Sequence, residues 1–461
     1  MSEMVEKQNI AVILAGGIGS RLGAASPKQF FKVAGKMVIE HTIDIFNRHQ
    51  KIDEIAVVIH PDFVNMMEEI VLRNKWQKVK KILKGGSERY QSSLSAINAY
   101  HDVPDARLIF HDAVRPLVGQ GVIDDVVTAL DSYDAVDVAV AATDTIIQVN
   151  ETGEFITSIP NRNYLRRGQT PQAFKLSVIE KAYELALEDS AFVCTDDCGT
   201  VKKYMPEVPI FVVKGEESNM KLTYKEDTFL LDKLFQLHST QMQHSDDLHS
   251  LKDKVIVVFG GNSGIGEEIV TLASSYGAKV YSFSRSATNT DICNYNSVES
   301  ALSSVATQNR HIDYIVNCAA ILAKEPLITM DKALINTIIA TNYNGMVNVA
   351  LASYPYLQNS EGQLLLYTSS SYTRGRAFYS IYSSTKAAVV NFMQAIAQEW
   401  DQDNIRVNVI NPERTNTPMR VKNFGIEPAN TLLTAKEVAM VSLQTLLSNQ
   451  TGQVVDVKIK K

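Results

Sequence analysis

Cysteine, surplus positive charge and long apolar runs are all scarce in this sequence. Its 461 residues include four cysteines, too few and too irregularly spaced for a disulfide framework. The formal net charge is −6, whereas nucleic-acid-binding domains are usually basic. No apolar run is long enough to span a bilayer, and no secretory signal pattern is present. We therefore expect a reduced, cytoplasmic, soluble protein that binds small molecules and neither nucleic acid nor membrane.

What the sequence does contain is enough apolar content for two cores. Hydrophobic residues make up 45% of the chain and charged residues 21%, and 461 residues exceed what one compact core usually holds. One stretch, residues 239–251, is polar and lacks any periodicity, which is typical of a linker. We predict two domains, residues 1–238 and 252–461, joined by this linker.

Short apolar runs alternate with segments of helical period throughout the first half. This alternation predicts an α/β fold, a doubly wound Rossmann-like parallel sheet with helices on both faces. Ligands of such sheets bind at the carboxyl ends of the strands. The expected strands include residues 55–59, 108–110, 136–142 and 209–213, and the expected helices include residues 91–100 and 121–130.

The first strand, residues 11–14, is followed by a glycine-rich loop with Gly16, Gly17 and Gly19. Glycines let backbone N–H groups approach an anion, although many turns use glycine only to bend. Two cations, Arg21 and Lys28, flank the loop. Fixed positive charge beside backbone donors is what a nucleoside triphosphate attacked at its α-phosphate requires. This stretch therefore predicts a triphosphate site rather than a plain surface turn.

Polar residues follow two further strands of the first half. Gly86 and Ser87 come after an apolar pair at 82–83, where they could grip a pyrimidine edge or simply cap a helix. Asp112 follows the strand at 108–110 and is well placed to hold Mg²⁺. Arg115 would then be either a ligand of the substrate phosphate or the salt-bridge partner of Asp112.

The motifs LAGGIGSRLG, PKQF, GGSERYQSS, HDAVRP, QTPQAF and NMKLTYKED occur in order between Ile10 and about Gln236. This half resembles the 2-C-methyl-D-erythritol 4-phosphate cytidylyltransferase family and its alditol-phosphate relatives. The resemblance implies that Arg21 and Lys28 stabilise the α-phosphorus and that Asp112 binds magnesium. It also implies a CTP site formed by Leu14, Ala15, Gly16, Gly17, Gly19, Gly86, Ser87 and Ser92, and substrate contacts from Arg115, Thr143, Arg162 and Lys221.

The second half begins with a new apolar strand, residues 254–259, followed by the turn GGNSGIG. A strand, a glycine turn and a helix N-terminus together form a cradle for a dinucleotide pyrophosphate. The next strand, residues 279–283, leads to Arg285 rather than to an acidic residue. Arginine suits the 2′-phosphate of NADP, so we expect NADPH; the alternative is that Arg285 is only solvated.

Tyr382 and Lys386 are four residues apart and share one helical face. A nearby ammonium lowers the pKa of a phenol towards its working range. Ser369 lies upstream and can hold a carbonyl oxygen while Tyr382 donates a proton and a nicotinamide donates hydride. The set predicts a carbonyl reductase.

The motifs GGNSGIG, NCAA, TNYNG, YSSTK and NPERTNTPM make this half, about residues 251–461, similar to the short-chain dehydrogenase/reductase family. Three positions depart from the family pattern, namely Phe259, Cys318 and Glu413. The resemblance implies catalytic roles for Asn342, Ser369, Tyr382 and Lys386. Implied cofactor contacts are Gly260, Gly264, Ile265, Gly266, Arg285, Asp291, Asn317, Tyr382 and Lys386. Pairing of subunits is common in this family, so we expect a homo-oligomer, with a dimer first.

The two halves together resemble the fused ribulose 5-phosphate reductase/CDP-ribitol pyrophosphorylases that supply capsule and teichoic-acid polymers. This implies reduction of D-ribulose 5-phosphate to D-ribitol 5-phosphate by NADPH, followed by transfer of CMP from CTP. Three alternatives stay open: a methylerythritol-phosphate cytidylyltransferase with an unrelated reductase, an enzyme of another polyol phosphate, and a non-catalytic, cofactor-sensing second half.

The phosphate of the ketose needs a cation in the second half, and arginine matches phosphate oxygens best. Arg374 and Arg376 lie between Ser369 and Tyr382, and Arg414 follows the Asn411-Pro412 turn. We predict that at least one of these three arginines holds the phosphate, with Arg420 as a fourth candidate.

Overall fold

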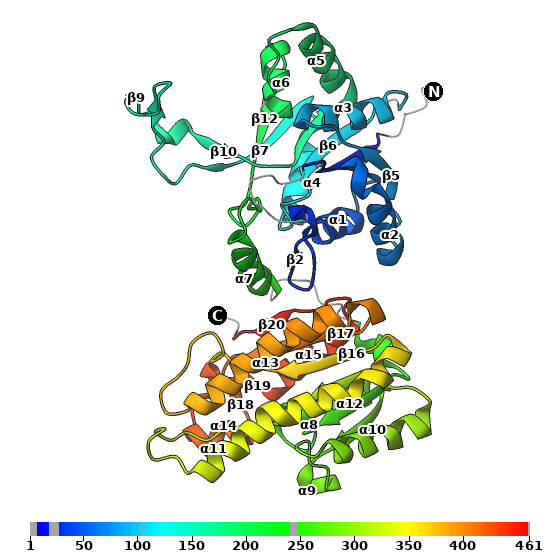
Figure 1. The fold of residues 1–461 in the computed structure, drawn as a ribbon, viewed down its shortest axis with the longest axis vertical. Coiled ribbons are helices and arrows are strands. Elements are labelled where there is room, and N and C mark those ends of the chain that lie inside the picture. The colour runs from blue at the N-terminus through cyan, green and yellow to red at the C-terminus, as the bar shows by residue number, and fades with distance from the viewer. Residues whose placement is uncertain (1–6, 18–26, 104, 195, 240–246, 460–461) are drawn as a thin grey trace. The chain divides into compact units, whose positions relative to one another are not determined.

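The computed structural model describes residues 7–17, 27–103, 105–194, 196–239 and 247–459. The chain forms two compact units, Met1–Leu231 and Asp232–Lys461, each an α/β layered fold (Figure 1). The division falls within helix α7 (Asp227–Ser239). Arg21, Gly19 and most of the predicted linker lie outside the described residues, and the predicted domain boundaries remain a proposal.

Unit 1 contains an eight-stranded sheet whose main order is β10-β7-β11-β6-β1-β4-β5, with β12 beside β7. The central strands β4, β1 and β6 are parallel, and their middle residues are buried Ile, Val, Leu, Ala and Phe side chains, as the apolar runs predict. The bounds are β1 Asn9–Ala15, β4 Glu54–Ile59, β5 Val79–Lys84, β6 Arg107–Asp112, β7 Ala135–Ala141, β10 Arg166–Gly168, β11 Gln172–Lys175 and β12 Ile210–Lys214.

The prediction of a purely parallel sheet is wrong for two strands. β11 pairs antiparallel with both β6 and β7, and β10 pairs antiparallel with β7. Both strands are reached from β7 through an irregular excursion rather than through a crossover helix. Because the excursion does not cross the face of the sheet as a helix would, the chain re-enters at the same end of the sheet and runs back antiparallel.

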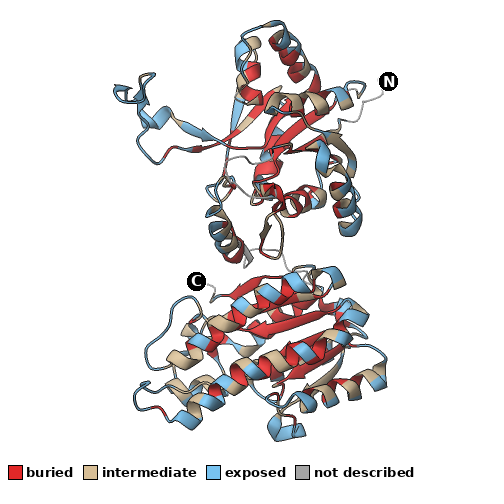
Figure 2. Cartoon of the chain, viewed as in Figure 1, coloured by how far each residue is buried: buried red, intermediate tan, exposed pale blue. Residues whose placement is uncertain are grey.

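That excursion, residues 142–165, is called the arm below. It carries the two short strands β8 (Gln148–Val149) and β9 (Ile156–Ser158), which pair with each other. Figure 1 shows it extending away from the sheet of unit 1, and Figure 2 shows that it is largely exposed. Its exposed apolar side chains include Phe155, Ile159 and Tyr164.

Helices cover both faces of the unit 1 sheet. One core packs α1, α2 and α4 against the sheet, and the other packs α3, α5 and α6 against the opposite face. The bounds are α1 Val38–Arg48, α2 Val64–Asn74, α3 Arg89–Tyr100, α4 Gln120–Ala129, α5 Leu176–Glu188 and α6 Asp197–Tyr204. A small hairpin, β2 (Lys32–Val33) and β3 (Lys36–Met37), precedes α1.

Unit 2 contains a six-stranded, wholly parallel sheet in the order β14-β13-β15-β16-β17-β20. The strand order reverses at β13, which is the point where such folds bind ligands. The bounds are β13 Val255–Phe259, β14 Lys279–Phe283, β15 Tyr314–Asn317, β16 Gln363–Tyr367, β17 Arg406–Pro412 and β20 Val454–Val457. A separate short pair, β18 (Thr415–Asn416) and β19 (Leu433–Thr434), lies after β17.

One face of this sheet packs against α10, α12 and α13, and the other against α8 and α15. Leu248 and Leu251 of a short 3₁₀ helix, η5 (Leu248–Leu251), are fully buried in the second of these cores. The bounds are α8 Gly264–Ser275, α9 Arg285–Thr288, α10 Tyr295–Asn309, α11 Lys332–Ile339, α12 Gly345–Ser360, α13 Ser380–Glu399, α14 Pro418–Phe424 and α15 Ala435–Leu447. Among the described residues, no helix has the length and apolar content needed to cross a membrane.

Candidate active sites

The glycine loop after β1 meets the loop after β5 in unusually close contact. A Cβ atom on Gly16 would lie 2.7 Å from the hydroxyl oxygen of Ser92, and one on Gly85 would lie 3.2 Å from the Cα of Gly16. Side chains at these positions would push the two loops apart. Gly17 faces open space, with nothing within 4 Å of the place of its Cβ. The backbone here is therefore accessible to an anion, as the sequence predicts.

Lys28 is tied to the same loop through its neighbour. It begins a short 3₁₀ helix, η2 (Lys28–Phe30), after Pro27. The buried side chain of Gln29 donates a hydrogen bond of 2.8 Å to the carbonyl oxygen of Ala15, at the end of β1. This bond holds the start of η2 against the carboxyl end of the strand from which the glycine loop departs.

Gly86 and Ser87 precede the N-terminus of α3. The hydroxyl of Ser87 donates to the side-chain oxygen of Gln91 at 3.0 Å, and the backbone N–H of Glu88 donates to the same oxygen at 3.1 Å. These contacts are those of a helix cap, the alternative that the sequence left open for this segment. They also keep Ser92 in place against the glycine loop.

Asp112, the last residue of β6, is surrounded by three cations. Its carboxylate lies 2.8 Å from Arg89, 2.9 Å from Lys221 and 3.5 Å from Arg115. Burial alone would raise the pKa of this carboxyl, but the three positive charges reverse that effect and hold the pKa well below its ordinary value. Asp112 is thus a permanent anion, and the predicted residues Asp112, Arg115 and Lys221 do come together.

Arg89 is a member of this cluster that the sequence analysis missed. Its guanidinium bridges two buried carboxylates, Asp112 and Asp197, with the second contact at 3.2 Å. Burial works to lower the pKa of Arg89, but these carboxylates raise it above its usual range. Asp197 also accepts a hydrogen bond of 2.7 Å from Tyr183. Arg89 belongs to the motif GGSERYQSS, but Asp197 is 108 residues away in the sequence. No local sequence pattern therefore predicts that Arg89 links the two carboxylates.

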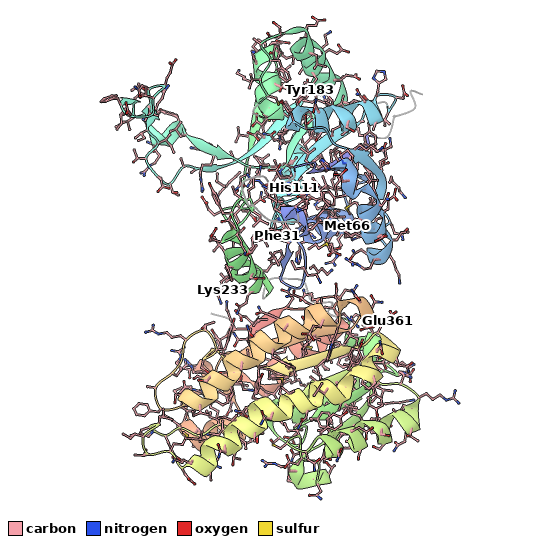
Figure 3. All side chains as sticks on the ribbon, in the orientation of Figure 1. Phe31, Met66, His111, Tyr183, Lys233 and Glu361 are labelled. Atoms are coloured by element: carbon pink, nitrogen blue, oxygen red, sulfur yellow. The ribbon has the colours of Figure 1, made fainter. Side chains whose placement is uncertain are left out.

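Hydrogen bonds of Thr170 and Asn219 fix the backbone and side chains around Asp112 and Arg115. The hydroxyl of Thr170 accepts from the backbone of Asp112 at 3.1 Å and contacts Nδ1 of His111 at 3.0 Å. Asn219 donates to the carbonyl of Thr170 at 2.9 Å, and Arg115 donates to the carbonyl of Asn219 at 2.7 Å. His111 lies in the interior of unit 1 (Figure 3), where burial lowers its pKa to about 4 and keeps it uncharged at neutral pH.

The predicted substrate residues Thr143 and Arg162 lie on the arm. Arg162 donates to the carbonyl oxygen of Thr143 at 2.9 Å, and both residues are exposed. Within the part of the chain that the structure describes, neither forms a hydrogen bond or ion pair with Asp112. The arm therefore brings these two residues together with each other and not with the cation cluster of unit 1.

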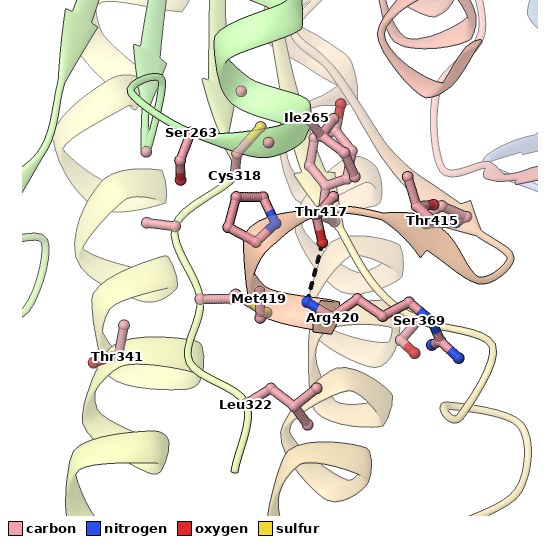
Figure 4. Close-up of a pocket in the computed structure, with 18 of the residues that line it drawn as sticks. Ser263, Ile265, Cys318, Leu322, Thr341, Ser369, Thr415, Thr417, Met419 and Arg420 are labelled. Atoms are coloured by element: carbon pink, nitrogen blue, oxygen red, sulfur yellow. Dashed lines mark hydrogen bonds between the residues drawn. The ribbon is translucent and has the colours of Figure 1, made fainter. Parts of the chain in front are cut away.

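Unit 2 contains a cleft of about 870 Å³ at the carboxyl ends of its strands (Figure 4). Most of the residues that the sequence analysis assigned to this half line it. Asn317, Asn342 and Arg374 are not among the lining residues. Those that do line it are Gly260, Gly264, Ile265, Gly266, Arg285, Asp291, Ser369, Arg376, Tyr382, Lys386 and Arg414.

The glycines after β13 are required by the backbone. Gly260 has a φ of +79°, and a Cβ there would lie 2.7 Å from the backbone nitrogen of Ala319. A Cβ on Gly266 would lie 2.3 Å from the carbonyl oxygen of Gly260. The turn thus packs directly against the next strand and presents the N-terminus of α8 to the cleft, which fits a dinucleotide pyrophosphate. Arg285, at the start of α9, lines the same cleft.

Asn342 supports the cleft from one layer behind. It lies in a π-helical turn, η6 (Ala340–Asn344), between α11 and α12. Its side chain accepts from the backbone N–H of Ile321 at 2.7 Å and donates to the carbonyl of Ile321 at 2.9 Å. It also donates to Thr385 at 3.2 Å. A π turn re-aims a side chain at a functional site, and this one fixes the loop after β15 to α13.

Burial dominates the pKa values of the reactive pair in this cleft. Burial raises the pKa of Tyr382 to about 12, against a smaller opposing effect of its contact with Ser369. Burial lowers the pKa of Lys386 to about 8. The Lys386 ammonium donates to the carbonyl of Tyr367 at 2.8 Å and lies 5.6 Å from the centre of the Tyr382 ring. Lys386 forms no salt bridge with any described residue.

Two of the residues that depart from the family pattern, Cys318 and Glu413, lie at the cleft. Burial raises the pKa of the Cys318 thiol to about 12, so this residue is a neutral wall of the cleft. Glu413 directs its carboxylate to the backbone N–H of Ile459 at 2.9 Å, while its own N–H donates to Val457. The carboxylate of Glu413, which stands where the family has a glycine, therefore accepts a hydrogen bond from the backbone that follows β20.

Arginines gather at one end of the cleft. Arg376, Arg414 and Arg420 line it. Arg420 donates from Nε and Nη2 to the two oxygens of Glu427, at 2.6 and 2.9 Å, and Arg414 lies 3.8 Å from the same carboxylate. Arg420, the fourth candidate predicted from the sequence, therefore lies in the cleft beside Arg414, and no sequence pattern predicts its partner Glu427.

The usual protein metal sites are groups of His, Cys, Asp and Glu side chains. In the described ranges, no three side chains of His, Cys, Asp or Glu form a group that could hold a metal ion. Cys194 and Cys198, with three residues between them in the sequence, are both free cysteines, and Cys198 lies within α6.

Comparisons with known proteins agree with this division. Residues 9–262 match the family described as 2-C-methyl-D-erythritol 4-phosphate cytidylyltransferase, and residues 282–425 match the short chain dehydrogenase family. The bifunctional ribulose 5-phosphate reductase/CDP-ribitol pyrophosphorylase Bcs1 of Haemophilus influenzae is 48% identical over 99% of this chain and 97% of its own.

Two further proteins match the first half alone. The ribitol-5-phosphate cytidylyltransferase of Streptococcus pneumoniae is 36% identical over 47% of this chain and 94% of its own. The crystal structure of 4-diphosphocytidyl-2C-methyl-D-erythritol synthase from Anaerococcus prevotii is 30% identical, covers 49% of this chain and 97% of its own, and gives a TM-score of 0.44.

Proposed function

The chain belongs to the family of bifunctional ribulose 5-phosphate reductase/CDP-ribitol pyrophosphorylases, and we propose that it catalyses both reactions. NADPH reduces D-ribulose 5-phosphate to D-ribitol 5-phosphate, and CMP is then transferred from CTP to give CDP-ribitol and pyrophosphate, for capsule or teichoic-acid polymers. The observation that carries this proposal is the 48% identity over 99% of the chain, with a separate reactive cluster in each unit. Both cosubstrates are cytoplasmic metabolites, so we assign the enzyme to the cytoplasm.

In the transferase, the backbone around Gly16 and Gly17 binds the triphosphate of CTP, and Arg21 and Lys28 stabilise charge at the α-phosphorus. An oxygen of the alditol phosphate attacks that phosphorus, and pyrophosphate leaves. Arg115 and Lys221 hold the alditol phosphate, because both lie beside Asp112 at the open end of the sheet. Gly86, Ser87 and Ser92 face the cytosine.

Asp112 has the chemistry expected of a magnesium ligand. It is a permanent carboxylate, and it lies opposite Leu14 in the register of β6 and β1, next to the triphosphate loop. Mg²⁺ commonly uses only one or two carboxylates and takes its other ligands from phosphates and water. Asp112 would hold the ion on these terms, and the cations now paired with it would turn to phosphate oxygens.

In the reductase, the turn from Gly260 to Gly266 holds the pyrophosphate of NADPH, and Arg285 holds its 2′-phosphate. The bound cofactor supplies the hydride for the ketose carbonyl. Ser369 holds the carbonyl oxygen, and Tyr382, whose phenol is protonated at neutral pH and whose pKa burial raises to about 12, donates the proton to it. Lys386, with a pKa near 8, keeps a positive charge beside the phenol as the proton leaves. Three arginines that line the cleft, Arg376, Arg414 and Arg420, supply positive charge for the substrate phosphate.

We further propose that the enzyme is a dimer in which the arm of one subunit completes the transferase site of the other. Two observations support this. Thr143 and Arg162 stand on the exposed arm, and large apolar side chains there, such as Tyr164 at 84% exposed, lack cover. In an exchanged dimer, mixing Arg162→Ala with Lys28→Ala subunits restores activity at about a quarter of all sites, because one site of each mixed dimer is intact. No restoration would mean that each subunit forms its own complete site.

The proposed function is tested by product identity. The full chain is given CTP, NADPH and a panel of ketose phosphates, alongside 2-C-methyl-D-erythritol 4-phosphate without NADPH, and the nucleotide product is identified by mass. CDP-ribitol from D-ribulose 5-phosphate, in a reaction that needs both cosubstrates, is the expected result. A product only from the methylerythritol phosphate, or only from another polyol phosphate, would contradict the proposal.

A further inference from the structure

One end of the reductase cleft carries a charge cluster with an unusual arrangement. Arg414 and Arg420 share the carboxylate of Glu427, which follows α14 in the loop that leads to β19. Lys324 lies nearby, with its ammonium 4.9 Å from the centre of the Phe424 ring. Arg414, Arg420 and Lys324 thus surround one anion, so the cluster keeps a surplus of positive charge. Arg376 lines the same cleft.

Arg420 is the most strictly oriented of these cations. Glu427 accepts two hydrogen bonds along one edge of its guanidinium, from Nε and Nη2. One face of the guanidinium lies over Phe424, with 4.5 Å between its central carbon and the ring centre. Its backbone N–H bonds the hydroxyl of Thr417, the N-cap of α14, at 3.3 Å (Figure 4). Nη1 donates to no acceptor among the described residues, so the outer edge of the fork stays available.

A row of aromatic rings joins this cluster to the proton donor. The Tyr382 ring centre is 6.4 Å from that of Tyr379, and the Tyr379 ring centre is 5.8 Å from that of Phe424. All three residues line the cleft, as does Arg420. The row gives a continuous cleft wall from Tyr382 to Arg420, along which a small substrate with its carbonyl at Tyr382 can extend. The anionic end of such a substrate is the part that the cluster would meet.

We propose that Arg420 is the residue that recognises the phosphate of the ketose substrate, and that Glu427 is the positioning residue that orients it. This deepens the proposed reductase function and rests on it. An unrestrained arginine loses rotamer freedom when it binds phosphate, which weakens binding. Glu427 orders the side chain before substrate arrives and leaves the Nη1 edge for phosphate oxygens. Arg414 and Lys324 offset the negative charge that Glu427 brings.

The test of Arg420 compares a phosphorylated with an unphosphorylated substrate. With the full chain and NADPH, KM and kcat are measured for D-ribulose 5-phosphate and for D-ribulose, and inorganic phosphate is titrated as a competitor of the former. Arg420→Ala is expected to raise KM for D-ribulose 5-phosphate and the inhibition constant of inorganic phosphate roughly 10- to 100-fold. The values for D-ribulose, the KM for NADPH and the rate of cytidylyl transfer stay near wild type. Lys422→Ala is the matched control, since it removes one cation from α14 outside the cleft lining.

Glu427→Gln separates positioning from simple repulsion by the sign of its effect. If Glu427 only repelled the phosphate, removing its charge would lower KM for D-ribulose 5-phosphate. As a positioning residue it raises that KM about fivefold with kcat unchanged, and it adds nothing in the Arg420→Ala background. A lowered KM, or an additive loss in the double variant, would overturn the role of Glu427.

Wild-type KM and phosphate inhibition in Arg420→Ala would overturn the assignment of the phosphate to Arg420 while leaving the reductase function intact. A rise in the KM for NADPH instead would mean that Arg420 serves a cofactor phosphate, and this also overturns the proposal. If the wild-type enzyme reduces D-ribulose as well as D-ribulose 5-phosphate, both the proposed substrate and this inference fail.

Discussion

The two reactive clusters handle charge in opposite ways. In unit 1, Asp112 is buried among Arg89, Arg115 and Lys221, and the three cations hold its pKa far below the ordinary value in spite of burial. In unit 2, burial sets the pKa values of Tyr382 and Lys386, and no carboxylate within the described ranges pairs with the lysine. Ion pairs thus dominate the first cluster, and burial dominates the second.

The difference follows from the chemistry that each site performs. Transfer of a nucleotidyl group moves several negative charges past one another, so fixed positive charge is the main requirement. Transfer of a proton to an alkoxide requires instead a donor and a neighbour whose pKa values are tuned by their surroundings. A fused enzyme can meet both demands because each site has its own sheet and its own core.

The substitution expected to separate the two activities most strongly is Tyr382→Phe. The variant keeps the ring and loses the proton donor, so ketose reduction falls about 100- to 10,000-fold. Cytidylyl transfer to supplied D-ribitol 5-phosphate stays at the wild-type rate. NADPH oxidation and pyrophosphate release, assayed separately, give the two rates. A parallel loss of transfer would mean that the clusters are not independent.

Lys28→Ala and Arg21→Ala are the reciprocal changes. Each removes one charge proposed to act on the α-phosphorus, which costs about 3 kcal/mol of transition-state stabilisation and thus about 100-fold or more in rate. Reduction of D-ribulose 5-phosphate continues unchanged, and D-ribitol 5-phosphate accumulates. Lys32→Ala, a nearby exchange in β2, is the control for loss of a charge in this region. Accumulation of CDP-ribitol at the wild-type rate would contradict the assignment.

Acidification should weaken unit 1 through two histidines, His41 and His111. Burial lowers the folded-state pKa of each to about 4, below the ordinary value near 6.5, so the unfolded chain binds these protons first as pH falls. The stabilising contribution is complete above pH 6.5 and is lost between pH 6.5 and 4, by about 3 kcal/mol at most for each histidine. Each unit holds one of the two tryptophans, Trp76 and Trp400, so unfolding of Trp400→Phe by urea reports on unit 1 and that of Trp76→Phe on unit 2. Equal pH dependence of the two reporters would contradict this.

The smallest change in rate or affinity is expected from Arg285, in the cofactor part of the reductase cleft. Arg285 lines the cleft at the start of α9, and Arg285→Ala should raise the KM for NADPH about tenfold while leaving that for NADH unchanged. The variant thus loses cofactor preference and keeps kcat. An unaltered ratio of the two cofactors would show that Arg285 does not meet the 2′-phosphate.

The sequence predicted best where local pattern and chemistry coincide. Apolar runs located the central strands to within one or two residues, because the middles of strands that are buried on both faces are continuous apolar runs. The rule that ligands gather at strand ends brought out Asp112 and Arg115, and the four-residue spacing brought out Tyr382 and Lys386.

What the sequence could not reveal depends on partners far apart in the chain. Arg89 acquires its role from Asp197, and the antiparallel strands β10 and β11 from the arm that precedes them. Arg420 is separated from Glu427 by only six residues, yet the bidentate contact depends on the bend of the chain after Gly425, whose φ is +76°. Neither propensity nor motif spacing specifies such a bend.

The presence of two self-contained units on one chain has a consequence for the cell. Translation of a single message yields reductase and transferase sites in equal number, so their ratio cannot be adjusted by expression. Balance between supply and use of the alcohol intermediate must then be set by turnover rates alone. Because each unit has its own sheet and core, selection can tune one rate without disturbing the packing that supports the other.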